Sequence, residues 1–226
     1  MTASIFGASG FTGSTILDLL LADSSFTEVK VFVRKPMNIK HAKLQEFIID
    51  FDKIADYQVN IKSDVVFNCM GTTIKKAGSK AAQQTIDRDY PVAIAQVAAL
   101  AGVGKILNVS SVGAEGNPSN FYLKTKTEME RGVATAMGKN AYFFRPSFIV
   151  GNRPEFRLAE RGGIYLMKIF DLGLVAGLSK WHSMPVETLA QSMINVAKNG
   201  YKQPVLEYKE ILESVLVETG LNLLIA

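Results

Sequence analysis

Short apolar runs alternate with stretches of helical periodicity through the first 150 residues of the chain. Apolar runs bounded by turn residues predict buried strands at residues 3–7, 29–33, 47–49, 65–69, 106–109 and 141–144. The intervening stretches predict helices at residues 11–22, 79–101 and 120–136. Strands separated by helices need right-handed crossovers, so the pattern predicts an α/β fold built on a doubly wound parallel sheet.

The pattern loosens after Pro146. The sequence predicts a polar loop, a helix, a second loop and a further helix at residues 151–163, 164–172, 173–182 and 186–197. Ligands of doubly wound folds bind at the carboxyl ends of the strands. We therefore expect residues 147–210 to supply a substrate lid and the last elements of the sheet.

The chain shows neither an internal repeat nor a linker. This continuity predicts a single domain over residues 1–210, followed by a tail over residues 211–226. The tail carries apolar residues at helical spacing from Leu212 onward. Such a segment either caps the core of its own chain or joins a homodimer, and both alternatives stay open.

Composition narrows the classes of function. Of the 226 residues, 48% are apolar, which favours a globular core over disorder. The single cysteine, Cys69, excludes a disulfide within these residues and a cysteine-rich zinc module, and its place at a strand end suggests a small packing residue. The two histidines, His41 and His182, lie far apart, so no metal site is expected.

Charge and hydropathy bear on partners and location. The net charge of +4 mildly favours anionic ligands, but the basic residues are scattered, so no nucleic-acid partner is expected. The N-terminal residues lack a basic segment, and the longest apolar run, residues 92–103, is too short to cross a bilayer. These features predict a cytoplasmic protein without a membrane partner.

A glycine-rich turn joins the first predicted strand to the first predicted helix. Its first glycine permits a tight turn, its second lets the backbone approach a pyrophosphate, and its third lets the helix pack on the strand. Phosphates would then lie at the positive end of the helix dipole. The sequence thus predicts a dinucleotide site, with a ligand-free turn as the alternative. The residues assigned to it are Gly7, Ser9, Gly10, Phe11, Thr12 and Gly13.

The end of the second predicted strand indicates which dinucleotide is bound. NAD-binding folds place an acidic residue here for the ribose hydroxyl, whereas this chain has Arg34 and Lys35. A guanidinium binds a 2′-phosphate in a bidentate fork, so we predict NADP; two solvated charges before a turn are the alternative. Other strand-end residues fall near the expected adenine and its ribose, although a simple turn explains them too: Asp50, Cys69, Met70 and Gly71.

Catalytic chemistry is suggested by Tyr122 and Lys126, which lie four residues apart on a predicted helix and therefore share one face. A neighbouring ammonium favours the phenolate form of a tyrosine and suits it to acid–base work at neutral pH. Ser110 and Ser111 end the fifth predicted strand, and a serine hydroxyl there can hydrogen-bond a carbonyl oxygen. A solvent-facing helix with incidental spacing is the alternative.

Together these elements resemble the short-chain dehydrogenase/reductase superfamily. The order of further motifs is similar to an atypical branch, the Tat-interacting-protein family of NADPH-binding proteins and its bacterial relatives. The resemblance spans residues 2–208 and implies a Rossmann fold with bound NADP(H). It carries a Ser/Tyr/Lys active site onto Ser111, Tyr122 and Lys126. The motifs are Gly71-Thr72-Thr73, Lys76-Ala77-Gly78, Asp87-Arg88-Asp89-Tyr90, Phe144-Arg145-Pro146 and Met184-Pro185-Val186.

The resemblance has one notable departure. Many members place an asparagine of a proton relay on the long central helix, and the nearest equivalent here is Asp87. Its carboxylate could pair with Arg88 or with Lys126. Family members are also known as regulators that bind other proteins, so the resemblance supports cofactor binding more firmly than turnover.

Further residues have two open interpretations each. Arg145 or an arginine of the following loop (Arg153, Arg157, Arg161) would meet the cofactor's pyrophosphate, or would form ion pairs with Glu155 and Glu160. Trp181 and His182 would line the substrate pocket or pack as aromatics. Lys75, Lys76 and Lys80 are expected on a solvated rim of the cofactor cleft.

The resulting hypothesis is an NADP-dependent oxidoreductase with a small carbonyl or alcohol substrate. Tyr122 would supply the proton, Lys126 would assist it and hold the nicotinamide ribose, and Ser111 would polarise the oxygen. The alternatives are an NADPH-sensing module that presents a partner-binding surface, and a sugar-nucleotide epimerase. The short region after Pro146 leaves little room for a nucleotide-sugar domain.

Overall fold

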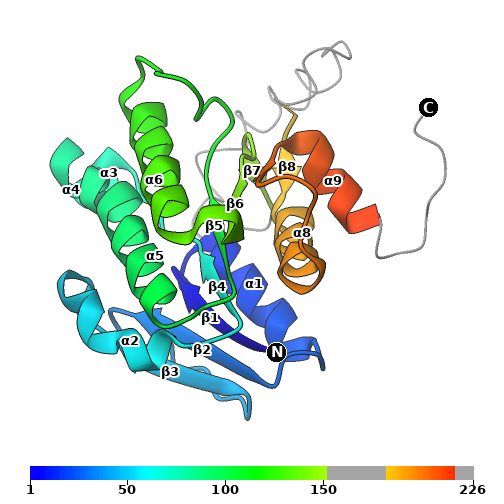
Figure 1. The fold of residues 1–226 in the computed structure, drawn as a ribbon. Helices are drawn as coiled ribbons and strands as arrows, with labels where there is room; N and C mark the ends of the chain where they lie inside the picture. The colour runs from blue at the N-terminus through cyan, green and yellow to red at the C-terminus, as the bar shows by residue number, and fades with distance from the viewer. Residues whose placement is uncertain (152–181, 217–226) are drawn as a thin grey trace.

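The computed structural model describes residues 1–151 and 182–216. Its centre is a seven-stranded parallel sheet with the strand order β3-β2-β1-β4-β5-β6-β9 (Figure 1). The chain crosses over between β3 and β4, so the two halves of the sheet are wound in opposite directions from β1 and β4. The strands are β1 (Thr2–Phe6), β2 (Glu28–Val33), β3 (Leu44–Ile48), β4 (Val65–Asn68), β5 (Lys105–Val109), β6 (Ala141–Phe144) and β9 (Val205–Leu206).

Helices cover both faces of the sheet, and each face has its own core. One core joins the sheet to α1 (Phe11–Ala22), α8 (Val186–Asn199) and α9 (Tyr208–Leu216). The other joins it to α5 (Tyr90–Leu100) and α6 (Phe121–Met137). Short elements complete the described chain: η1 (Phe51–Tyr57), α2 (Gln58–Ile61), α3 (Ile74–Ala77), α4 (Lys80–Gln84), η2 (Thr85–Asp89), η3 (Gly138–Asn140), β7 (Ile149–Val150) and β8 (Met184–Pro185).

The central strands are buried on both faces of the sheet, which explains why apolar residues predominate in their sequences. In β1, Ile5 faces the first core and Phe6 the second, and both are fully buried. The Phe6 ring stacks on Phe32 of β2 with 4.6 Å between ring centres, and Phe32 stacks in turn on Phe47 of β3. These contacts fix the order of the first strands around the glycine turn.

The doubly wound parallel sheet is confirmed, with differences in detail. The third strand covers Leu44–Ile48 rather than residues 47–49, because it is a sheet edge with half-exposed residues and a weak apolar signal. The helix expected at residues 79–101 is divided into α4, the π-helical turn η2 and α5. The two-residue strands β7, β8 and β9 were not predicted. The helix expected at residues 164–172 and most of the expected lid lie outside the described residues.

An ion pair joins the ends of two helices on one face. Lys198 of α8 lies 2.6 Å from Asp23, which follows α1. Burial by itself would raise the pKa of Asp23, but hydrogen bonds from Lys198 and Ser25, together with the charge of Lys198, lower it from 3.8 to about 2. The folded state therefore holds the charged form of Asp23 more strongly than the unfolded state does.

We expect Asp23→Asn to lower the free energy of unfolding at neutral pH and to alter its acid dependence. Because the folded-state pKa is depressed, the stability contributed by Asp23 is complete well above pH 3.8 and disappears as the pH falls toward about 2. Urea unfolding of parent and variant at a series of pH values measures this difference. Asp18→Asn, on the exposed side of α1, is the control. A difference that stays constant from neutral pH to pH 2 would contradict the assignment.

None of the helices within residues 1–151 and 182–216 combines the length and the hydropathy needed to span a membrane.

Candidate active site

The glycine turn is closely packed on two sides and open on the third. Gly7 has a φ of +82°, and a Cβ there would lie 2.6 Å from the carbonyl oxygen of Cys69. A Cβ on Gly13 would lie 2.1 Å from the carbonyl oxygen of Gly7. A Cβ on Gly10, by contrast, would meet only that same oxygen among the described residues, at 3.2 Å. The first and third glycines thus hold α1 against the strand ends, while the second leaves its surface free for a ligand.

The N-terminus of α1 faces this opening. Gly10 is the N-cap residue and offers no side chain to the N–H groups of the first turn, which contains no acidic residue. These N–H groups and the helix dipole favour an anion. Phe11 and Thr12 begin the helix; Thr12 is buried, and the Phe11 ring lies against Gly151.

A cavity of about 260 Å³ lies over the glycine turn. Several residues predicted from the sequence line it: Gly7, Ser9, Gly10, Arg34, Cys69, Met70 and Gly71. Others were not predicted as ligand contacts: Phe32, Val33, Phe51, Thr72, Ile86 and Tyr90, together with Lys76, which the sequence placed at the rim. The lining thus combines backbone at the strand ends with apolar and aromatic walls and a basic edge, which fits a dinucleotide.

A second depression of about 620 Å³ continues from the cavity and shares Ser9, Val33 and Arg34 with it. Lys35 lines this part, and both Arg34 and Lys35 are exposed. Among the described residues that line the two spaces, cations are present and carboxylates are absent. The described lining of the two spaces thus carries positive charge, which suits an anionic ligand.

An aromatic wall closes the other side of the cavity. The Tyr90 hydroxyl donates a 2.7 Å hydrogen bond to Asp52, and its ring lies 5.4 Å from that of Phe51. The hydrogen bond to Asp52, burial and the nearby carboxylates raise the pKa of Tyr90 to about 12, so the phenol keeps its proton. Asp50, which the sequence placed near the adenine and its ribose or in a simple turn, accepts a hydrogen bond from the Asp52 amide and caps η1. It does not line the cavity in the described structure.

Cys69 is a packing residue at the end of β4. Burial raises the pKa of its thiol to about 12, although the charge of Lys126 acts in the opposite direction. The thiol is therefore protonated at neutral pH and is not a reactive thiolate.

Helix α6 presents Tyr122 and Lys126 beside the ends of two strands. Asn120 fixes the start of the helix, because its side chain accepts hydrogen bonds from the amides of Tyr122 and Leu123. One turn further on, Lys126 is only 3% exposed. Its ammonium donates to the carbonyl oxygens of Val109 at 3.2 Å and Met70 at 3.5 Å.

Tyr122 and Ser111 remain more accessible than the lysine. Tyr122 is 37% exposed, so its side chain is partly accessible to solvent. Within the part of the chain that the structure describes, the Ser111 hydroxyl donates only to the adjacent carbonyl of Val112, at 3.2 Å, a weak local bond that a substrate oxygen can replace. Ser110 is buried, and its hydroxyl has no partner among the described residues.

Asp87 is fully buried and does not pair with Arg88. Arg88 instead lies 2.7 Å from Asp89 and 2.8 Å from Glu128. Burial raises the pKa of Asp87, while the charge of Lys126 and hydrogen bonds from Thr72 and Gln83 oppose that rise. Of the two partners considered from the sequence, the structure thus favours Lys126.

Arg145 takes part in ion pairs rather than lining the cavity. Its guanidinium forms a bidentate contact with Glu130, at 3.0 and 2.7 Å, and lies 3.7 Å from Glu115 and from Glu207. These contacts favour the ion-pair interpretation over the pyrophosphate contact suggested by the sequence, with glutamates other than Glu155 and Glu160. Those two glutamates lie outside the described residues, as do Arg153, Arg157, Arg161 and Trp181.

The His182 ring lies 5.4 Å from that of Tyr208, which favours aromatic packing for this histidine. Within the described ranges, no group of three or more histidine, cysteine or acidic side chains could hold a metal ion.

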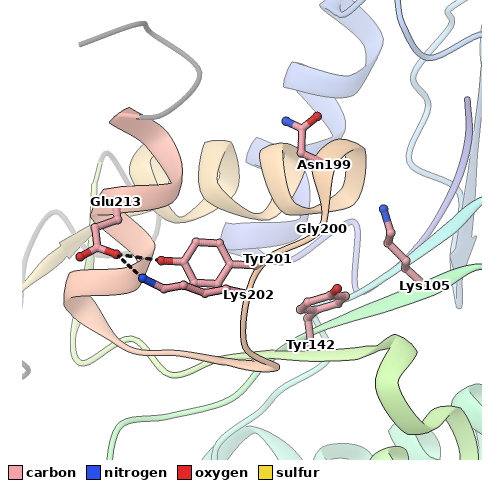
Figure 2. Close-up of a pocket in the computed structure, with 7 residues that line it drawn as sticks. All are labelled: Lys105, Tyr142, Asn199, Gly200, Tyr201, Lys202 and Glu213. Atoms are coloured by element: carbon pink, nitrogen blue, oxygen red, sulfur yellow. Dashed lines mark hydrogen bonds and ion pairs between the residues drawn. The ribbon is translucent and has the colours of Figure 1, made fainter. Parts of the chain in front are cut away.

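A separate depression of about 670 Å³ lies at the amino-terminal ends of β5 and β6 (Figure 2). Tyr201 and Lys202 both contact Glu213 of α9, at 2.9 and 3.4 Å. Lys105, the first residue of β5, donates to the carbonyl of Ala197. These contacts attach α8 and α9 to the sheet. The depression is at the opposite end of the strands from the glycine turn, so it is not part of the candidate site.

The fold and the glycine turn define the class as nucleotide-binding proteins with an NAD(P)-binding, oxidoreductase-like fold. The sequence profile described as NAD(P)H-binding matches residues 7–148, and the chain belongs to that family. The resemblance to the Tat-interacting-protein family is confirmed by the rat Protein HTATIP2. It is 30% identical over 214 residues, which cover 92% of this chain and 86% of that protein.

Other relatives and structures agree with this assignment. Protein fmp52-2, mitochondrial, from Neosartorya fischeri is 31% identical over 206 residues, covering 87% of this chain and 83% of that protein. Among solved structures, the Bordetella bronchiseptica enzyme WbmH in complex with NAD⁺ has a TM-score of 0.69 at 17% identity, covering 100% of this chain and 83% of that one. The Thermotoga maritima UDP-glucose 4-epimerase with UDP-glucose has a TM-score of 0.67 at 14% identity, covering 99% and 84%. These structural likenesses establish the fold.

Alanine substitutions of two glycines should separate folding from cofactor binding. At Gly13 a methyl group would collide with backbone, so Gly13→Ala should destabilise the fold by about 1–3 kcal/mol. At Gly10 a methyl group needs only a small shift of one carbonyl but occupies the open surface. Gly10→Ala should therefore fold normally and bind NAD(P)H about ten- to a hundredfold more weakly. Thermal unfolding and fluorescence titration measure the two effects. Normal NAD(P)H binding by Gly10→Ala would contradict this placement of the cofactor.

Proposed function

We propose that this protein is an NADP(H)-dependent oxidoreductase of the short-chain dehydrogenase type, with a small carbonyl or alcohol substrate. The observation that carries the proposal is the position of Lys126. Its buried ammonium bonds the backbone at the ends of β4 and β5, where the cofactor cavity begins, and lies one helical turn from the accessible Tyr122. An acid–base group is thereby supported by a cation beside a dinucleotide site.

The cofactor is assigned to the cavity over the glycine turn. The N–H groups at the start of α1 would hold the pyrophosphate, the aromatic wall would contact the adenine, and Arg34 with Lys35 would bind the 2′-phosphate. When bound, the nicotinamide supplies a hydride to a carbonyl carbon or accepts one from an alcohol.

The chain's own residues would handle the proton and the oxygen. In the reductive direction Tyr122 donates its phenolic proton to the substrate oxygen, and Lys126 stabilises the negative charge that remains on the phenol. Ser111 turns its hydroxyl from the Val112 carbonyl to the substrate oxygen and stabilises charge that develops there. Lys126 is also assigned to the nicotinamide ribose.

Cofactor preference tests the first part of this proposal. We expect NADPH to bind more tightly than NADH, and Arg34→Ala to remove most of that preference, about ten- to a hundredfold in affinity, because a charge-assisted bidentate contact contributes about 1.5–3 kcal/mol. Fluorescence titration of both cofactors measures it. Lys139→Ala, an exposed cation outside both cavities, serves as the control. Equal dissociation constants for NADPH and NADH in the parent protein would overturn the NADP assignment.

Turnover tests the second part and separates the alternatives. A panel of aldehydes, ketones and quinones should reveal slow oxidation of NADPH that depends on Tyr122. Tight NADPH binding with no Tyr122-dependent oxidation would favour a cofactor-sensing module. Interconversion of nucleotide sugars without net cofactor oxidation would favour an epimerase.

A further inference from the structure

The loop that follows β4 is held from two sides by oppositely charged, buried side chains. This loop, Met70 to Thr72, forms one edge of the cofactor cavity. Asp87 comes from the π-helical turn η2 and Lys126 from α6, so two separate helices meet at this loop.

Asp87 binds the far end of the loop. Its Oδ1 accepts a 2.8 Å hydrogen bond from the Thr72 amide, and its Oδ2 accepts one of 3.3 Å from Gln83. Gln83 also donates to the Thr72 carbonyl at 3.2 Å. Asp87 is 0% exposed, and both of its oxygens act as acceptors, as those of an ionised carboxylate do.

Lys126 binds the near end of the loop, through the carbonyl of Met70. Gly71 lies between the two anchors. A Cβ at Gly71 would stand 3.9 Å from the Lys126 Nζ and 4.0 Å from the Asp87 Oδ1, so both charges approach the same point beside the loop.

Other charged groups near these helices already have partners. Arg88 and Glu128 pair with each other, and Glu130 pairs with Arg145. An isolated buried ammonium or carboxylate is costly, whereas removal of both members of a buried pair costs much less than removal of one.

We propose that Asp87 is a positioning residue, which fixes the loop at the cofactor cavity and serves as the counter-charge of Lys126. The proposal rests on the proposed function only for the catalytic role of Lys126. In this proposal the Asp87 carboxylate affects cofactor binding through Lys126 and the loop, without contact with the substrate.

The test is a cycle of three variants: Asp87→Asn, Lys126→Met, and the two combined. The asparagine keeps an acceptor for the Thr72 amide but removes the charge. We expect Asp87→Asn to lower the melting temperature and to weaken NADPH binding by about tenfold, the scale of one lost charge-assisted bond. Adding Lys126→Met should restore the melting temperature of Asp87→Asn, because no uncompensated charge then remains. An aspartate that acts only through its hydrogen bonds to the loop would not be rescued by loss of the Lys126 ammonium.

Two controls sharpen the cycle. Asp89→Asn, the neighbouring carboxylate that pairs with Arg88, should combine additively with Lys126→Met. Gln83→Ala loses the bonds to the Thr72 carbonyl and to Asp87 Oδ2 but keeps the Asp87 charge, so it should weaken NADPH binding modestly and likewise add to Lys126→Met. If Asp87→Asn alone does not fold, a folded double variant supports the proposal and an unfolded one overturns it.

Additive effects of Asp87→Asn and Lys126→Met, or parental NADPH affinity in Asp87→Asn, would overturn the proposal. Neither readout needs a substrate. A protein that binds NADPH but catalyses nothing would contradict the proposed oxidoreductase activity while leaving this cycle fully informative.

Discussion

Tyr122→Phe should lower turnover of any carbonyl substrate by about 10²–10⁴-fold, the usual contribution of a general acid. The substitution removes one oxygen and its transferable proton but keeps the ring. The hydroxyl has no hydrogen bond to other described residues that would be lost, and the ring is partly exposed. Cofactor affinity and the melting temperature should therefore stay close to the parent values.

Rates of NADPH oxidation with the best substrate of the panel measure this effect. Tyr142→Phe provides a matched control, because Tyr142 lines the depression at the opposite end of the sheet. Near-parental turnover by Tyr122→Phe would remove the phenol from the mechanism. A loss of equal size in both tyrosine variants would show a general effect on the fold.

Arg145→Leu should destabilise the folded protein by about 3–5 kcal/mol, because it removes the cation of a buried ion pair and leaves the carboxylate uncompensated. The Glu130 side chain is only 9% exposed and receives two hydrogen bonds from Arg145. Glu207 and Glu115 lie farther away, at 3.7 Å, and would then face Glu130 without an intervening cation.

Urea unfolding of Arg145→Leu, Glu130→Leu and the combined variant measures the interaction between the two residues. The combined variant should be more stable than Arg145→Leu alone, because two apolar side chains replace the pair. Glu115→Gln is the control, and its effect should be below about 1 kcal/mol because Glu115 is 58% exposed. If the combined variant is less stable than either single variant, Arg145 stabilises the fold by contacts other than this pair.

Much of the sheet was predictable because its central strands are buried on both faces. Apolar residues predominate in β1, β2 and β4, and that pattern depends only on neighbours in the sequence. The edge strand β3 begins earlier in the chain than predicted, because its half-exposed positions weaken the pattern of apolar residues. The two-residue strand β9 has too few residues to form a pattern, and its place beside β6 depends on packing of α8 and α9.

The candidate site divides in the same way. The glycine turn and Arg34 were predictable because each function needs a particular residue at a fixed distance along the chain. The bond between Asp52 and Tyr90 joins residues 38 positions apart, and the Arg145 pair depends on two elements that meet only in the fold. The motif that contains Tyr90 was visible in the sequence, but nothing local assigned its ring to a cavity wall.

The wide turn η2 sets the rotational phase of the helix that contains it. A π-turn accommodates one residue more than an α-turn, and each residue of an α-helix advances the chain by about 100°. Gln83 lies before the turn and Asp87 within it, and both face the loop after β4. Ile94 lies beyond the turn and faces the core. Deleting one residue here would rotate one half of the helix against the other and turn either set away from its partners. This segment should therefore tolerate very few insertions or deletions.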